Sequence, residues 1–372
     1  AGKWQRVSWD AALTEIADSV LDTITTEGSD RVIWDCGPLY TYGTMSAAHQ
    51  RLAYLLDSTT LDPNTEIGDG RRGLAETFGK VVFDRSADDY FFSDLILIWG
   101  GNPIATQIPN AHFLLEARYK GAKLVCISPD YNPSSIHADL WVSVRPGSDA
   151  ALALSIAHEI IASGRFDREF VREQTDLPLL VRDDTGRYLR GSDLSTSGSP
   201  DELFLHDPKR GVVAAPRRSL ALAGLEPDLE GRFEVKGRDG RPISVRPVFD
   251  RLRQHLEAYA PEKAAAMCGT KPALIRRLAA MVSEAKSAST VSTSNFSKYY
   301  HGNLIERAQV LVFALAGQFG RKGSGFAGFP MLSHDGLERS TLPVIDLATR
   351  TRMIANALAD RVRLHVAGYT PE

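Results

Sequence analysis

The sequence predicts an α/β protein in which a parallel sheet carries helices on both faces, as a three-layer αβα lobe, beside a second α/β lobe. Two observations support this fold class. Apolar runs of strand length alternate with helical segments between residues 95 and 163, which is typical of parallel strands joined by helical crossovers. The length of 372 residues exceeds one average domain and therefore favours two lobes.

The composition excludes several classes of protein. Apolar residues make up 43% of the chain and charged residues 24%, which is ordinary for a globular protein. The net charge of −3 gives no sign of a basic surface for nucleic acid. No apolar run reaches the roughly 18–20 residues of a spanning helix, so no direct membrane insertion is expected. Cys36, Cys126 and Cys268 are isolated, which predicts buried thiols rather than a thiolate metal site.

The spacing of apolar residues assigns the elements in order. The first are a helix from Trp9, a strand at 32–35, a helix at 44–56 and a loop at 62–73 that is rich in Gly, Pro, Asn and Asp. Strands at 95–99, 123–127 and 140–144 follow, with helices at 112–120 and 149–163. Further helices are expected at 247–259, 271–285 and 304–317, with a Ser/Thr-rich strand at 290–294.

These elements divide the chain into three segments. Residues 90–290 are expected to form a Rossmann-like dinucleotide-binding lobe, because strand and helix alternate there. Near 182–245 the helical period is lost and Gly, Asp and Arg are dense, which predicts an irregular insertion of short strands and turns. Residues 1–89 and 291–372 are expected to form the second lobe, left incomplete by this sequence.

Trp99-Gly100-Gly101-Asn102-Pro103 follows the first strand of the Rossmann-like lobe. Glycines at such a turn let backbone amides approach a pyrophosphate, and Asn102 could bond it from the side. The alternative is a tight strand–helix turn with no ligand. A plain NAD-binding domain is disfavoured because no GxGxxG sequence stands at this turn.

Acidic residues follow the next two strands. Ser128 and Asp130 end the second strand, where an acid can hold a ribose hydroxyl or a guanine edge. Pro146, Gly147 and Asp149 follow the third strand, and the Asp149 carboxylate could accept two hydrogen bonds from guanine. The alternatives are an Asx-type turn for Asp130 and a helix N-cap for Asp149.

Two further segments carry candidate residues. Lys298 lies in Asn295-Phe296-Ser297-Lys298, after the Ser/Thr-rich strand, where a cation could stabilise an oxyanion or act as an acid. Gly320 and Gly323 form a glycine-rich turn after a helix, and glycines permit close approach to a ligand. The alternatives are a surface lysine and a helix C-cap followed by a loop.

The order and approximate spacing of these motifs resemble the dimethyl sulfoxide reductase family of molybdopterin-guanine-dinucleotide oxidoreductases, from Lys3 to about Phe329. The resemblance implies domains like those of formate dehydrogenase and dimethyl sulfoxide reductase, with bis-molybdopterin guanine dinucleotide and molybdenum as cofactors. Asp69 precedes Trp99 by an interval similar to that of the aspartate ligand in the nitrate reductase group (type II). The resemblance therefore makes Asp69 the expected molybdenum ligand, with Asp62 as runner-up and a plain turn as the alternative.

The resemblance also implies a reaction. The segment around Lys298 is similar to ethylbenzene dehydrogenase and steroid side-chain dehydrogenase catalytic subunits, which favours water-dependent hydroxylation of an unactivated C–H, assisted by Lys298. Leu39, Tyr40 and Tyr42 could line an apolar pocket. The alternatives are reduction of an oxyanion such as nitrate, selenate or chlorate, and a non-catalytic subunit that keeps the cofactor fold.

Family members are usually longer, so we expect this sequence to be a fragment. The resemblance places a 4Fe-4S cluster in a missing N-terminal segment and a β-barrel domain after the last lobe. It implies an iron-sulfur electron-transfer subunit and a haem subunit as partners. A bacterial, periplasmic protein is expected, with the cytoplasm as the alternative location.

Overall fold

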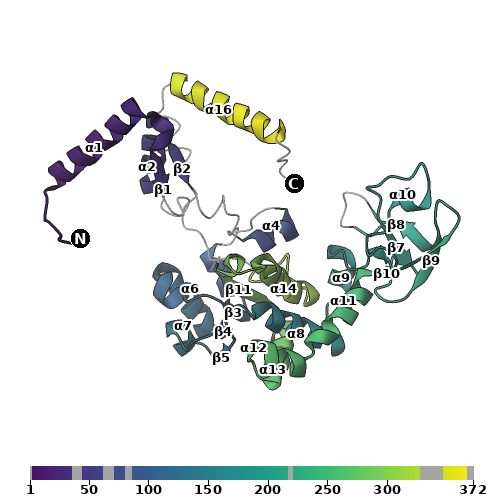
Figure 1. The fold of residues 1–372 in the computed structure, drawn as a ribbon. Helices are drawn as coiled ribbons and strands as arrows, with labels where there is room; N and C mark the ends of the chain where they lie inside the picture. Colours follow the sequence, from purple (N-terminus) through teal and green to yellow (C-terminus); the bar gives the residue numbers. More distant parts are fainter. Residues whose placement is uncertain are drawn as a thin grey trace. The chain divides into compact units, whose positions relative to one another are not determined.

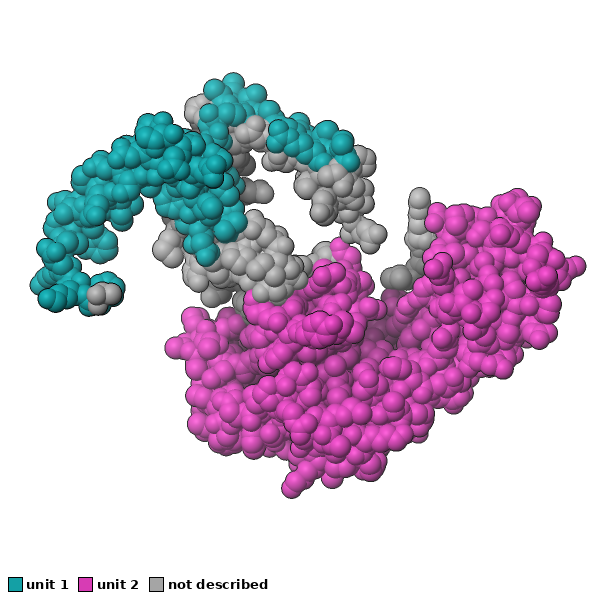
Figure 2. Space-filling model, in the orientation of Figure 1, with its two compact units in different colours: residues 1–70, 331–372 teal, residues 71–330 magenta. Residues whose placement is uncertain are grey.

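The computed structural model describes residues 2–35, 44–61, 71–79, 86–216, 221–293, 295–326 and 347–366. The chain divides into two compact units, Arg71–Pro330 and a second unit made of Ala1–Gly70 with Met331–Glu372. Figure 2 separates them by colour. Each unit is described by itself.

The smaller unit, at the two ends of the chain, is mainly helical. Its elements are α1 (Trp9–Thr26), η1 (Ser29–Arg31), β1 (Ile33–Asp35), α2 (Thr44–Leu56), β2 (Thr59–Leu61) and α16 (Leu347–Val366). Ser8 begins α1 by accepting a hydrogen bond from the Ala11 amide at 3.2 Å. Strands β1 and β2 pair in parallel.

The larger unit is built on a four-stranded parallel sheet in the order β11-β3-β4-β5. The strands are β3 (Leu95–Trp99), β4 (Lys123–Ser128), β5 (Leu140–Ser143) and β11 (Ala288–Ser292). The helices that accompany the sheet are α4 (Arg72–Phe78), η3 (Ala87–Phe92), α5 (Pro103–Thr106), α6 (Ile108–Tyr119), α7 (Pro133–Ile136), α8 (Asp149–Ala162), α9 (Arg168–Gln174), α11 (Val248–Leu256), η4 (Glu257–Tyr259), α12 (Pro261–Cys268), α13 (Pro272–Glu284), η5 (Phe296–Lys298) and α14 (Gly302–Leu315).

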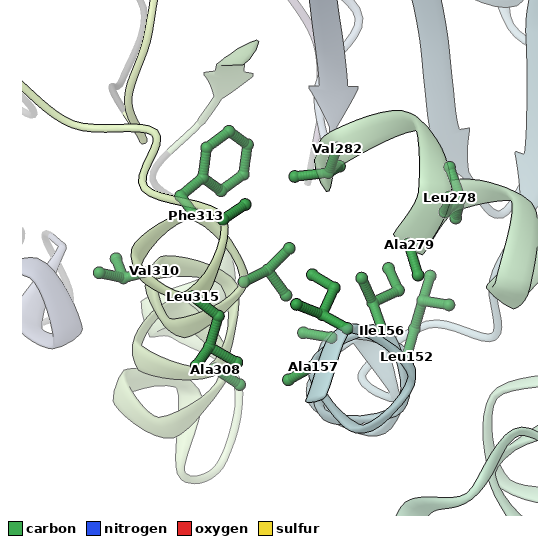
Figure 3. Close-up of a cluster of buried hydrophobic side chains, with 14 of the residues drawn as sticks. Leu152, Ile156, Ala157, Leu278, Ala279, Val282, Ala308, Val310, Phe313 and Leu315 are labelled. Carbon is green, nitrogen blue, oxygen red and sulfur yellow. The ribbon is translucent and has the colours of Figure 1, made fainter. Parts of the chain in front are cut away.

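Alternate residues of β3 face two different cores. Leu95, Leu97 and Trp99 pack with α8, α13 and α14, whereas Ile96 and Ile98 pack with η3 and α6. Helices therefore cover both faces of the sheet (Figure 1), which confirms the predicted three-layer αβα lobe. Figure 3 shows side chains of α8, α13 and α14 meeting in the larger core. Cys126 and Cys268 are buried free thiols.

An antiparallel lobe interrupts the larger unit between α9 and α11. It contains a three-stranded sheet in the order β6-β10-β9 and the hairpin β7-β8. Its elements are β6 (Leu180–Arg182), α10 (Gly191–Leu194), β7 (Phe204–Asp207), β8 (Gly211–Ala214), β9 (Phe233–Lys236) and β10 (Pro242–Pro247). A small core of Leu180, Leu189 and Val245 supports it. Short strands and turns therefore lie where the sequence lost its helical period.

The structure differs from the expected boundaries in several places, and the strand expected at 290–294 is β11, Ala288–Ser292. Helix α4 begins at Arg72, inside the segment expected to be a loop up to residue 73. Residues 71–89, expected in the segment 1–89, and residues 291–330 group with the parallel sheet rather than with the end segments. Leu74 of α4 and the apolar side chains of α14 pack with α8 in the larger core. Across the described residues, no helix is both long and apolar enough to cross a membrane.

Candidate functional site

The carboxyl ends of the four parallel strands meet at one edge of the sheet. We call the loops at 99–102, 128–130, 144–149, 293 and 295–301 the carboxyl edge. The chain passes from β3 to β4 to β5 and then returns to place β11 on the other side of β3. In open α/β sheets, ligands bind where the strand order reverses in this way. The loops after β3 and β11 therefore flank the expected binding crevice.

Glycine is required in the loop after β3. Gly100 has φ +70°, and a Cβ there would overlap the Phe296 ring of the loop after β11. The Gly100 amide donates to the Ile127 carbonyl at 3.1 Å, and the Gly100 carbonyl accepts from Thr293 Oγ1 at 2.8 Å. A Cβ on Gly101 would come within 3.0 Å of Thr293 Cγ2. The two loops can approach this closely only because both residues are glycine.

Asn102 holds the same loop from its other side. Its Oδ1 accepts from the Ser134 hydroxyl at 2.7 Å and from the Ser134 amide at 3.2 Å. The Ser134 hydroxyl in turn accepts from the Ile104 amide at 3.2 Å. Asn102 thus joins the loop after β3 to the start of α7, which is a positioning role that the sequence pattern did not indicate.

Ser128 and Asp130 differ in their surroundings at the end of β4. Ser128 is buried, and its hydroxyl donates to the Asp130 carbonyl at 2.7 Å while accepting from Trp141 Nε1 at 3.1 Å. Asp130 is exposed. Ser128 therefore fixes the turn, and Asp130 presents its carboxylate to solvent at the carboxyl edge.

Asp149 is a buried carboxylate at the start of α8. Its Oδ1 accepts from Trp99 Nε1 at 2.9 Å, so the end of β3 and the start of α8 are joined through these two side chains. Burial raises the pKa of Asp149 to about 6, and the hydrogen bond from Trp99 offsets part of this effect. A buried carboxylate is costly unless donors satisfy it. Asp149 is thus suited to a ligand that supplies further N–H donors.

The loop containing Pro146 and Gly147 also contacts the segment that follows β11. Gly147 has φ +78°, and a Cβ there would lie 3.4 Å from Tyr299 Cδ1. Lys298, next to Tyr299, is the last residue of η5 and is exposed. The structure therefore brings Lys298 to the same edge as Gly100, Gly147 and Asp149.

Gly320 and Gly323 are not brought to this edge. The Gly323 amide donates to Asp89 Oδ1 at 3.0 Å, and its carbonyl accepts from the Ser93 hydroxyl at 2.7 Å. Ser93 precedes β3, so this turn lies at the opposite end of the sheet, which we call the amino edge (residues 86–94, 285–287 and 318–325). Gly323 has φ +72°, and a Cβ there would overlap the Phe92 backbone. Local packing accounts for this glycine.

Two buried charged residues, Arg71 and Glu306, were missed by the sequence reasoning. Arg71 Nη2 donates to the Ser292 carbonyl, at the end of β11, at 2.6 Å. Glu306 Oε2 accepts from the Gly73 amide at 2.9 Å. Burial raises the pKa of Glu306, while Ser297, the charge of Arg71 and two backbone amides act in the opposite direction. More than 200 residues separate the partners in each hydrogen bond, so no local motif could have revealed them.

Several sequence-predicted residues lie outside the described residues. They are Asp69, its runner-up Asp62, the pocket candidates Leu39, Tyr40 and Tyr42, and Cys36. Asp69 therefore stays a prediction from the sequence. Arg71, two residues after it, is the first described residue of the larger unit.

A separate cleft of about 850 Å³ lies where the antiparallel lobe meets α11. Its lining includes Arg187, Arg190, Arg251 and His255. None of the predicted site residues lines this cleft, so the candidate site is defined by the carboxyl edge and not by this depression.

Three relatives align with most of this chain. Chlorate reductase subunit alpha of Ideonella dechloratans is 39% identical over 329 residues, covering 87% of this chain and 35% of that protein. Dimethylsulfide dehydrogenase subunit alpha of Rhodovulum sulfidophilum is 39% identical over 334 residues, covering 87% of this chain and 36% of that protein. Perchlorate reductase subunit alpha of Dechloromonas aromatica is 36% identical over 352 residues, covering 87% of this chain and 38% of that protein.

The chain thus spans little more than a third of the length of these relatives. A solved structure, acetylene hydratase from Pelobacter acetylenicus, aligns with a TM-score of 0.49 at 21% identity, covering 86% of this chain and 34% of that chain. The family model described as molybdopterin oxidoreductase matches residues 1–367. This chain therefore belongs to the molybdopterin oxidoreductase family.

Proposed function

We propose that this chain is part of the catalytic subunit of a molybdenum enzyme that removes an oxygen atom from an oxyanion such as chlorate, perchlorate or nitrate. The observation that carries the proposal is the likeness, at 39% and 36% identity, to subunits named for chlorate and perchlorate reduction. The hydroxylation of a hydrocarbon or sterol, expected from the sequence, has no counterpart among these relatives. The alternative expectation is the better supported, and we adopt it.

The carboxyl edge fits the guanine-dinucleotide form of the family's pterin cofactor. The fit rests on Asp149, whose buried carboxylate is costly alone and would be stabilised by the N1–H and N2–H donors of guanine. Exposed Asp130 is suited to a ribose hydroxyl. The backbone at Gly100 and Gly101 would face the pyrophosphate. When bound, the cofactor supplies molybdenum for two-electron oxygen-atom transfer.

Lys298 has a position and a charge that suit it to bind the oxyanion substrate. It lies in η5, directly after β11, at the crevice where the strand order reverses. Its ammonium would hold the oxyanion by charge and donate a proton as oxygen leaves. In the net reaction the oxyanion accepts two electrons and two protons and releases water. Asp69 would bind molybdenum through its carboxylate, a hard oxygen ligand.

Electrons must reach this site from another protein or domain. The relatives are named as alpha subunits, which supports partner subunits for the complete protein. An iron-sulfur subunit, with a haem subunit beyond it, would supply the two electrons. We place the complete enzyme in the periplasm as part of the same proposal.

The test is to purify the full-length gene product from a host that makes the cofactor, and to measure its content of molybdenum and guanine dinucleotide. One molybdenum and two dinucleotides per chain, with turnover of chlorate, perchlorate or nitrate by a reduced dye, is the expected result. Turnover of ethylbenzene or a sterol without oxyanion reduction would restore the hydroxylase interpretation. A folded product with neither molybdenum nor dinucleotide would overturn the enzymatic proposal.

Asp69→Ala tests the ligand assignment in the same preparation. We expect it to abolish molybdenum retention and turnover, because no other protein ligand is proposed. Asp62→Ala is the matched control from the same stretch of sequence. Retained molybdenum in Asp69→Ala, with loss in Asp62→Ala, would transfer the role to Asp62.

A further inference from the structure

The first backbone amides of helix α4 donate to side chains that lie far away in the sequence. Its N-cap, Arg71, has φ +57° and supplies no side-chain cap. The Arg72 amide instead donates to the Ser297 hydroxyl at 3.1 Å, and the Gly73 amide donates to Glu306 Oε2 at 2.9 Å. The first amides of a helix need such acceptors. Here η5 and α14 provide them.

The contact between α4 and α14 leaves little freedom at this end. A Cβ on Gly73 would overlap the Asn303 carbonyl and approach Glu306 Cβ. Glu306 is fully buried, and the charge of Arg71 stabilises its carboxylate. The Arg71 guanidinium is itself fixed to the Ser292 carbonyl at the end of β11. Burying a carboxylate contributes little net stability. We therefore interpret Glu306 as a residue that fixes the position of the start of α4.

The two described segments that meet at Glu306 are neighbours, in the sequence, of the two proposed catalytic residues. Arg71 follows Asp69 by two residues, and Ser297 immediately precedes Lys298. We propose that Glu306, together with Ser297, is a positioning residue that fixes the chain following the molybdenum ligand against the turn that presents Lys298. This inference rests on the proposed function. Groups that orient metal ligands commonly change metal affinity or activity by roughly 10- to 100-fold when removed.

The experiment compares full-length Glu306→Ala and Ser297→Ala with a matched control, Glu76→Ala. Glu76 also joins α4 to α14, by accepting from Asn303 Nδ2 at 2.9 Å, but it leaves the first amides of α4 untouched. We expect hydrogen exchange at the Gly73 amide to accelerate roughly tenfold in Glu306→Ala, because a cap is lost. Molybdenum content should fall roughly 10-fold or more, and the g values of the Mo(V) electron paramagnetic resonance signal should shift.

Glu306→Gln keeps the size of the side chain and an acceptor for Gly73. We expect it to recover most of the exchange protection and molybdenum content, and it provides a folded variant if Glu306→Ala does not fold. Glu76→Ala should retain molybdenum and the wild-type g values. If both glutamate-to-alanine variants lower the melting temperature alike and neither changes molybdenum content or g values, the positioning role is overturned.

The same experiment separates this inference from the proposed function. Wild-type protein without molybdenum overturns the proposed function, and hydrogen exchange at Gly73 then decides whether Glu306 caps α4. Wild-type protein with molybdenum, and a Glu306→Ala variant with unchanged molybdenum and g values, overturns the inference alone.

Discussion

The two edges of the parallel sheet use similar sequence features for different purposes. Each has a glycine in the left-handed region, Gly100 with φ +70° at the carboxyl edge and Gly323 with φ +72° at the amino edge. In each case a Cβ would overlap a neighbouring loop, at Phe296 and Phe92 respectively. Glycine at an edge of the sheet therefore indicates a close approach of backbone, and that signal alone does not distinguish a ligand site from packing.

The edges differ in how their polar groups are satisfied. At the amino edge the Ser287 hydroxyl donates to the Phe92 carbonyl at 2.6 Å, and Ser93 and Asp89 bond Gly323. At the carboxyl edge Asp149 is buried with a raised pKa, and the side chains of Asp130 and Lys298 are exposed. Exposed charges occur at both edges, so the feature that separates them is the buried Asp149 carboxylate with its raised pKa, which is the chemistry of a binding edge.

The largest expected effect comes from substituting the two glycines. Gly100→Ala and Gly323→Ala should each destabilise the fold by roughly 3 kcal/mol, from backbone strain and overlap. Urea unfolding measures both. If the edges differ as described, only Gly100→Ala also lowers guanine-dinucleotide content in the molecules that remain folded. Equal loss of the cofactor in both variants would break the comparison.

Asp149→Asn tests the buried carboxylate of the carboxyl edge. Because the pKa of Asp149 is raised from 3.8 to about 6 in the folded chain, the folded state binds more protons than the unfolded state between these values. The contribution of Asp149 to stability is therefore present below about pH 4 and is lost as the pH rises through about 6, up to about 3 kcal/mol.

Cofactor-free Asp149→Asn should thus gain stability over wild type at pH 7 and not at pH 4, as measured by urea unfolding at both pH values. The amide oxygen of Asn can still accept the hydrogen bond from Trp99 Nε1, so the two proteins differ in the charge at this position and not in that hydrogen bond. A difference in the free energy of unfolding that is the same at pH 4 and pH 7 would show that ionisation of Asp149 does not destabilise the folded chain.

Lys298→Ala should separate catalysis from stability. The residue is exposed, so its removal should change unfolding by less than about 0.5 kcal/mol. Oxyanion turnover should fall by roughly 100-fold with the cofactor still bound, as for the loss of a general acid. The matched control at the amino edge is Lys322→Ala, also exposed, whose ammonium lies 5.1 Å from the Phe92 ring centroid. Equal turnover in the two variants would remove Lys298 from the mechanism.

Asp130→Ala should have the smallest effect. Asp130 is exposed, so we expect no change in unfolding and a loss of roughly fivefold in dinucleotide affinity, the equivalent of one hydrogen bond. Asp88→Ala, exposed at the amino edge, is the control. Calorimetric binding of guanosine diphosphate to cofactor-free protein measures both, and equal affinities would take Asp130 out of the site.

Local sequence predicted much of the sheet. The strand expected at 95–99 has those bounds in β3, and the helix expected at 44–56 has them in α2. Apolar runs such as 95–99 are informative because both faces of a parallel strand are buried. The helix expected from residue 112 begins earlier, at Ile108, where Pro109 is tolerated in the first turn.

Helix α4 shows why the rest could not be predicted. Residues 62–73 carry the glycines and acids of a loop, yet a helix begins at Arg72 because Glu306 and Ser297 accept hydrogen bonds from its first amides. Those acceptors lie more than 220 residues further along the chain. A local pattern contains no information about a cap from another helix.

The sequence by itself determined the α/β class, the parallel strands and the segments that carry Gly100, Asp149 and Lys298, because periodicity and strand-end residues are local properties. The tertiary structure decided which segments share an edge. It grouped the turn containing Lys298 with Gly100 and Asp149, and it placed Gly323 at the other end of the sheet. The physical reason is that β11 returns beside β3 from almost 200 residues away, and only folding determines which loops then meet.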